Sequence, residues 1–178
     1  MKKTIKILSM MLCIIMTAFG MVSCGETEDN DPLAIKSINV EYNLNLSQNW
    51  FDFYDVVVTY LDENGQSKSL TVTEKWNFGF SMSPNNAPRN YAFSVVATPK
   101  KDHPEINDAQ YILSQEIDAD FFCYRYDGTV FKELSSDLCA QKLTSNDVLT
   151  FSGSQFKDYL ESGSRNLMSF SKSWDGKY

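Results

Sequence analysis

Apolar and polar residues alternate without a break from residue 38 to residue 46, and no other feature of the sequence constrains the fold as much. The apolar positions are Ile38, Val40, Tyr42, Leu44 and Leu46, and the polar positions between them are Asn39, Glu41, Asn43 and Asn45. Successive side chains of a β-strand point to opposite faces, so this period of two predicts a strand with one buried face. A half-buried strand needs a second layer over it, and the sequence therefore predicts a layered β domain.

A β-hairpin is predicted next along the chain. Residues 50–61 are expected as a strand because they contain three consecutive β-branched valines, and residues 66–76 are expected as the returning strand. Asn64-Gly65 lies between the two segments and suits a tight turn that needs positive φ. Trp76 is expected in the core, at the end of the returning strand.

The later part of the chain repeats this alternation of strands and turns. A long loop that contains residues 81–90 is expected first, and it is followed by strands at residues 91–98, 109–118, 122–126, 129–134 and 166–171. The segment 109–118 also fits a short helix, and the strand is favoured. Asp127-Gly128 is a second hairpin turn signal. Ser154 is expected to cap one short C-terminal helix that carries Phe156, Tyr159 and Leu160 and ends at Gly163.

Many short strands, little helix and abundant tyrosine and phenylalanine together indicate a mainly β fold. The sequence predicts an antiparallel β-sandwich, immunoglobulin-like in the loosest sense, with a β-barrel as the alternative. Residues 33–178 are expected to form one β-rich domain, which is large enough to bury a hydrophobic core.

The first 23 residues have the organisation of an export signal. Lys2, Lys3 and Lys6 precede an uncharged, apolar segment, and small residues follow it. Met21-Val22-Ser23-Cys24 then places a small residue directly before a cysteine. This segment resembles the lipobox of bacterial lipoproteins, and the resemblance implies cleavage before Cys24 and lipidation of that cysteine. Several acyl chains hold a protein stably on a membrane, whereas one does not.

An ordinary transmembrane anchor is the alternative reading of the same segment. The apolar stretch is only marginally long enough to span a bilayer, and acidic residues follow it instead of a basic cluster. Residues 24–32 are therefore interpreted as the lipidated cysteine and an acidic linker. This linker is similar to the acidic tethers of surface lipoproteins of Bacteroidota. The similarity implies the outer membrane, with exposure at the cell surface as one of two orientations.

The charge of the mature chain excludes some partners. Removal of residues 1–23 takes away three of 16 basic residues and none of 23 acidic ones, which leaves a formal charge of −10. Nucleic-acid binding depends on basic patches and is disfavoured. Adsorption to anionic lipid headgroups is disfavoured for the same reason, so the lipid on Cys24 is the expected membrane contact.

Two cysteines remain once Cys13 leaves with the signal and Cys24 is lipidated. Cys123 and Cys139 are an even pair in an exported protein, which predicts a disulfide, with two separately buried thiols as the alternative. A zinc site is disfavoured because the two cysteines lie far apart and the chain has a single histidine, His103, in a polar turn. No metal or other cofactor is expected.

No catalytic motif is recognised. Glu116, Asp118 and Asp120 alternate along one predicted strand and would project to the same side, where carboxylates can perform acid–base chemistry or bind calcium. A solvated acidic face is the favoured interpretation of these residues. An envelope hydrolase that uses His103 or this acidic strand is kept as the alternative function.

The aromatic residues suggest a different activity. Trp50 and Trp174 lie next to a turn and near the chain end, so each fits either the core or a platform on which sugar rings stack. The leading hypothesis is a non-catalytic envelope module that captures glycan, mediates adhesion or assembles with another surface protein. An inhibitor or immunity-type lipoprotein fits the same features.

Overall fold

A computed structural model of the chain describes residues 31–87, 90–131 and 141–173. These residues belong to a compact unit, Asp31–Tyr178. No helix in these three ranges has the length and apolar character needed to cross a membrane. The elements are β1 (Ile35–Leu46), α1 (Gln48–Phe53), β2 (Tyr54–Leu61), β3 (Ser67–Val72), β4 (Trp76–Met82), the 3-10 turn η1 (Pro84–Asn86), β5 (Asn90–Pro99), β6 (Gln110–Arg125), β7 (Gln141–Ser152), α2 (Gly153–Glu161) and β8 (Arg165–Ser173).

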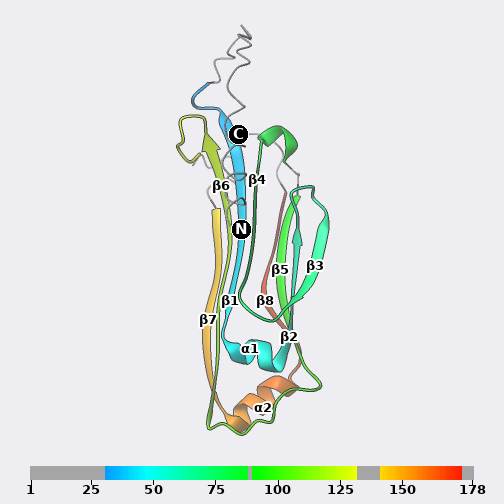
Figure 1. Cartoon of the computed structure of the whole chain (residues 1–178). Helices are drawn as coiled ribbons and strands as arrows, with labels where there is room; N and C mark the ends of the chain where they lie inside the picture. Colours follow the sequence, from blue (N-terminus) through cyan, green and yellow to red (C-terminus); the bar gives the residue numbers. More distant parts are fainter. Residues whose placement is uncertain (1–30, 88–89, 132–140, 174–178) are drawn as a thin grey trace, which may run out of the picture. The chain divides into compact units, whose positions relative to one another are not determined.

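The strands form two antiparallel sheets that face each other in this unit (Figure 1). Sheet A has the strand order β4-β1-β6-β7, and sheet B has the order β3-β2-β5-β8. Among the described residues each strand pairs only within its own sheet, so the sheets do not close into a barrel. The predicted mainly β sandwich is therefore confirmed.

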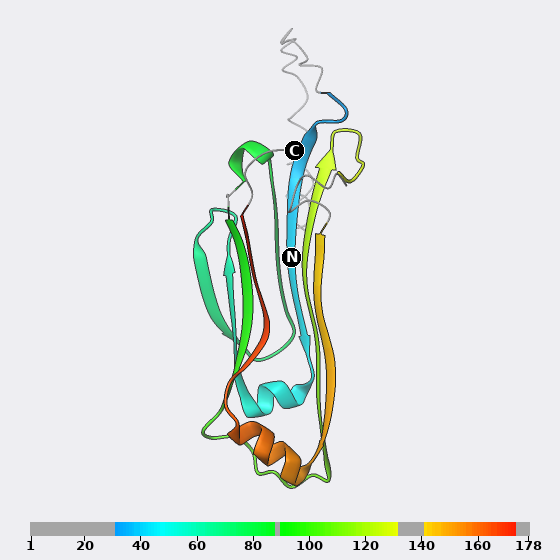
Figure 2. The same cartoon turned by 180° about the vertical axis from the view of Figure 1, so that it is seen from behind.

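Two helices lie at the same end of the sandwich, where the chain passes from one sheet to the other (Figure 2). α1 connects β1 of sheet A to β2 of sheet B, and α2 connects β7 of sheet A to β8 of sheet B. Phe156 on α2 stacks on Tyr111 of β6 with ring centroids 4.4 Å apart, and it meets Phe53 of α1 edge-on at 4.8 Å. The helices thus close this end of the core with aromatic side chains.

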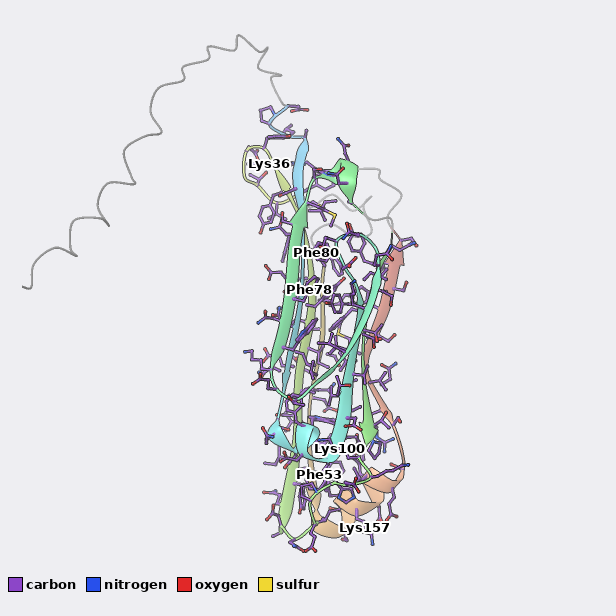
Figure 3. All side chains as sticks on the ribbon, turned by 45° about the vertical axis from the view of Figure 1, so that its right-hand side comes forward. Lys36, Phe53, Phe78, Phe80, Lys100 and Lys157 are labelled. Carbon is purple, nitrogen blue, oxygen red and sulfur yellow. The ribbon has the colours of Figure 1, made fainter. Side chains whose placement is uncertain are left out.

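The core lies between the sheets and is built from the inward members of each alternating strand. Tyr42 on β1 and Phe93 on β5 stack across the sheets with centroids 4.7 Å apart and planes within 7°. Phe78 and Phe80 of β4 extend this layer (Figure 3), and Phe78 packs on Tyr60 of β2 at 4.6 Å. Truncation of such a buried ring to alanine typically costs about 3–5 kcal/mol of stability.

The hairpin between β2 and β3 confirms the most specific turn prediction. Leu61 pairs with Ser67, and Gly65 has φ 70°. Asp62 organises the turn, because its Oδ1 accepts hydrogen bonds from the backbone N–H groups of Asn64 (3.0 Å) and Gln66 (2.8 Å). These two bonds lower the pKa of Asp62, and Lys68, whose Nζ lies 3.4 Å from Oδ2, contributes in the same direction.

The boundaries of this hairpin differ from the prediction at both ends. The strand predicted from Trp50 is wrong as far as Phe53, where the chain forms α1. Trp50, Phe51 and Phe53 are all buried there, which the two-residue period of a strand does not allow. The returning strand ends at Val72, and Trp76 begins β4 in the other sheet, opposite Leu44.

Three further strands differ from their predictions. Residues 81 and 82 were expected in the loop and residues 77–80 were not assigned to a strand, but residues 77–82 form most of β4, in which Phe78, Phe80 and Met82 alternate with polar or small residues. The segments predicted as strands at 109–118 and 122–126 are one continuous strand, β6. β7 was not predicted, although it pairs with β6 over the whole run from Gln141 to Ser152.

The remaining predictions agree more closely with the structure. β5 and β8 occupy the expected positions, and the tight turn at Asp127-Gly128 is present, with Gly128 at φ 84°. The predicted strand over 129–134 is described only as far as Phe131, whose N–H donates to the Cys123 carbonyl. The C-terminal helix forms, but its cap is Ser152 instead of Ser154: Gln155 Oε1 accepts the backbone N–H of Ser152 at 2.9 Å.

Candidate functional site

The outer face of sheet A is the part of the described surface where polar side chains converge. The strand register places these side chains in rows across β4, β1, β6 and, where it is described, β7. We call this surface the polar face and define it by Ser81–Asn39–Phe122, Gly79–Glu41–Asp120–Lys142, Asn77–Asn43–Asp118–Thr144 and Asn45–Glu116–Asn146. It therefore carries five amides, four carboxylates and one ammonium group.

Hydrogen bonds between strands fix several of these side chains. Ser81 Oγ donates to Asn39 Oδ1 at 2.8 Å, and Thr144 Oγ1 donates to Asp118 Oδ1 at 2.7 Å. Asn45 Nδ2 donates to Glu116 Oε2 at 3.2 Å. Side chains held by neighbouring strands lose little freedom when they bind a ligand, so these rows form a preorganised set of donors and acceptors.

Asp120 is the exception within this pattern. It is only 9% exposed, and its Oδ1 is buried without a hydrogen-bond partner among the described residues. Lys142 Nζ lies 3.5 Å from Asp118 Oδ2 and 3.9 Å from Asp120 Oδ2, so one ammonium group serves two carboxylates. Burial raises the pKa of Asp120, the charges of Asp118 and Glu41 raise it further, and Lys142 acts in the opposite direction.

A hollow of about 420 Å³ opens at the α1 end of the polar face. Its lining consists of Asn45, Leu46, Ser47, Ser114, Gln115, Glu116, Asn146 and Val148. Ser47 shapes its wall, because Ser47 Oγ donates to the Ile112 carbonyl (3.1 Å) and accepts the Ser114 N–H (3.0 Å). The hollow thus presents one exposed carboxylate between two exposed amides.

Apolar side chains lie beside these polar groups. Val148, which lines the hollow, is 67% exposed, and Ile112, its diagonal neighbour in the β6–β7 register, is 44% exposed. At the opposite end of the polar face, Phe122 and Tyr124 are half-buried with ring centroids 6.4 Å apart. The polar face therefore has apolar side chains near both of its ends, with polar side chains between them.

The outer face of sheet B provides a contrast within the same fold. One of its rows consists only of hydroxyl side chains, Ser69, Thr59, Ser94 and Ser169, and the next is Thr71, Val57, Val96 and Asn166. Both rows are uncharged. The concentration of amides and carboxylates on sheet A is thus not a general property of the outer strand positions of this chain.

Trp50 and Trp174 were each assigned either to the core or to a sugar-stacking platform, and only Trp50 lies in the described part of the chain. Trp50 is 1% exposed and packs on Tyr54 with centroids 4.9 Å apart, so the core alternative holds for this residue. Trp76 is half-buried and packs against the core beside Tyr60 and Phe78, as predicted. Trp174 lies outside the described residues.

The predicted cysteine sites are described only in part. Cys123 is fully buried on β6 and is disulfide-bonded. Cys139 lies outside the described residues, so the Cys123–Cys139 pair stays a prediction. Cys24 and the segment that resembles a lipobox also lie outside them.

The structure describes both sites of the alternative hydrolase, the turn that contains His103 and the acidic positions of β6. His103 Nδ1 is 2.7 Å from the Pro104 carbonyl oxygen, and its ring packs near Phe53 at 5.6 Å. In the described ranges no serine or carboxylate is hydrogen-bonded to His103. Glu116, Asp118 and Asp120 do share one side of β6, but no group of three potential ligands that would hold a metal ion is found in the residues that the structure describes.

Comparison of the sequence with protein-family models and with curated proteins gives no match. The polar residues of β1 and the residues of β4 and β7 that complete the polar face were not identified as site residues from the sequence. The alternation Trp76, Phe78, Phe80, Met82 is a strand signal that identifies β4. The pairing of β1 with β6 has no comparable local signal.

Proposed function

We propose that this chain is an exported lipoprotein, lipid-anchored to the outer membrane through Cys24, whose β-sandwich is a non-catalytic module that binds a glycan at the polar face. The observation that carries the glycan proposal is the hollow, where Glu116 lies between Asn45 and Asn146 and exposed Val148 forms one side. The basic, apolar and small residues before Cys24 support the anchor.

The chemistry of a sugar ring matches this combination of groups. Ring hydroxyls both donate and accept hydrogen bonds, carboxylates accept only, and amides do both, so Glu116 with two asparagines can satisfy adjacent hydroxyls. The C–H surface of a ring packs on apolar side chains such as Val148 and Ile112. A site of this kind, with few oriented polar groups and an apolar side, is typical of small-ligand recognition.

A glycan is favoured over a protein partner by the distribution of exposed apolar residues. Among the residues that the structure describes, the large exposed apolar residues are Leu33, Val96, Ile112, Tyr126 and Val148. Of these, only Ile112 and Val148 are register neighbours on one outer face. Protein-docking surfaces usually present contiguous apolar patches of several hundred square ångströms.

Binding of the full-length protein, purified from membranes in detergent, to an immobilised glycan panel tests the site. We expect Asn146→Ala to weaken binding of the retained glycan about tenfold, because one hydrogen-bond partner is lost. Asn166→Ala on the outer face of sheet B is the matched control and should leave binding unchanged. Equal effects of the two substitutions, or no retained glycan, would argue against the proposal.

The anchor has its own experiment. Cys24→Ser should abolish incorporation of a labelled fatty acid and release the protein from the membrane fraction, because a hydroxyl cannot form the thioether. Cys13→Ser, inside the signal segment, should leave both labelling and membrane association intact. Labelling that persists in Cys24→Ser would exclude this cysteine as the anchor.

A further inference from the structure

The charge of the polar face limits which glycans its hollow can accept. Glu116 lies in the hollow itself, and Asp118 and Asp120 follow it along β6 with Glu41 beside Asp120 on β1. Residues two apart on a strand are separated by about 6.7 Å, so a sugar chain that extends from the hollow along β6 crosses one carboxylate after another.

The basic residue on this face does not offset the carboxylates for a ligand. Lys142 is the one basic residue in the four described rows, and its Nζ already lies 3.5 Å from Asp118 Oδ2 and 3.9 Å from Asp120 Oδ2. An anionic group that approached the Lys142 ammonium group would therefore also come close to the carboxylates of Asp118 and Asp120, which would repel it. The hollow contains Glu116 without a basic residue in its lining.

We propose that the hollow and the adjoining rows of the polar face select uncharged glycans and reject glycans that carry carboxylate or sulfate groups. This inference rests on the proposed glycan-binding function. The amides Asn45, Asn43 and Asn146 supply hydrogen bonds to hydroxyl and acetamido groups, and the carboxylates discriminate by repulsion. Selectivity of this kind arises from an unfavourable interaction with the wrong ligand as much as from contacts with the right one.

Oligosaccharides of one chain length, prepared in neutral, uronate-bearing and sulfated forms, test the inference with the full-length protein. We expect the neutral form to bind at least about tenfold more tightly than either anionic form at low ionic strength. The difference should shrink as salt is raised to about 0.5 M, since salt screens repulsion between exposed charges.

Two substitutions separate local repulsion from the charge of the whole protein. Glu116→Gln should lower the ratio of neutral to anionic affinity at least about threefold, whereas Asp55→Asn on the outer face of sheet B removes the same charge and should leave the ratio unchanged. Equal or tighter binding of an anionic form, including binding that requires added calcium, overturns the inference while the glycan-binding function stands. Failure of every form to bind overturns the proposed function and the inference with it.

Discussion

At the scale of single residues, Asp120 is held in surroundings that oppose its charge. Its raised pKa means that the Asp120 carboxyl is protonated more readily in the folded protein than in the unfolded chain. Protonation of Asp120 therefore stabilises the folded state. This contribution is complete below the ordinary pKa of about 3.9 and is lost as the pH rises through the folded-state pKa. Residues kept at a cost in stability are common at functional sites, which is consistent with the proposed role of the polar face.

We expect Asp120→Asn to increase the free energy of unfolding at pH 7 by roughly 0.5 kcal/mol, a small value because solvent screens charges near the surface. The gain should decline towards pH 3, where the wild-type carboxyl is protonated in both states. Urea titrations at the two pH values measure it. Asp55→Asn is the control: Asp55 is exposed on the outer face of sheet B, so its replacement should bring no gain, and a gain in both variants would contradict the explanation.

At the scale of elements, the β2–β3 hairpin depends on the carboxylate of Asp62. Asp62→Ala removes the acceptor for two backbone N–H groups, so we expect a lower denaturant midpoint at neutral pH than in the wild type. Because the pKa of Asp62 is lowered in the folded protein, this contribution is present above about pH 4 and is lost as the pH falls through the folded-state pKa.

Glu63→Ala, at the exposed neighbouring position, is the control and should have little effect on the denaturant midpoint. Equal losses in the two variants at pH 7 would show that the turn does not depend on Asp62.

Local signals account for the elements that the sequence predicted correctly. β1 alternates without interruption, and the hairpin turn contains Asn-Gly, so both can be recognised within about ten residues. α1 has only six residues, too few for a helical period, and its aromatic residues suit a strand equally well. β7 is an edge strand, and its inward positions include Ser145 and Asp147, which weakens the alternation.

At the scale of the whole molecule, the polar face depends on pairings between distant segments. The acidic series on β6 was recognised from the sequence, but Asn45 meets Glu116 across a separation of 71 residues. That register is set by the joint burial of the inward faces of β1 and β6, and a shift by one residue would expose the core positions of the strand. The composition of the face could therefore not be derived from any single segment.

The core between the two sheets should also make the protein sensitive to alkaline pH. Tyr54 and Tyr91 are buried with hydroxyl groups that have no hydrogen-bond partner among the described residues, and burial raises the pKa of each to about 12. The unfolded chain ionises near pH 10, so the stability from these neutral tyrosines is complete below pH 10 and is lost between pH 10 and 12. We expect each of these two tyrosines to account for about 1–2 kcal/mol of the stability that is lost between pH 10 and 12.

Denaturant titrations from pH 8 to 12 measure this dependence. Tyr91→Phe should be close to wild type at pH 8, because the substitution removes a hydroxyl that has no partner, and it should retain more stability than the wild type at pH 11–12. Tyr126→Phe is the matched control, since Tyr126 is 44% exposed. Parallel pH profiles for wild type and Tyr91→Phe would mean that alkaline unfolding begins elsewhere than in the layer between the sheets.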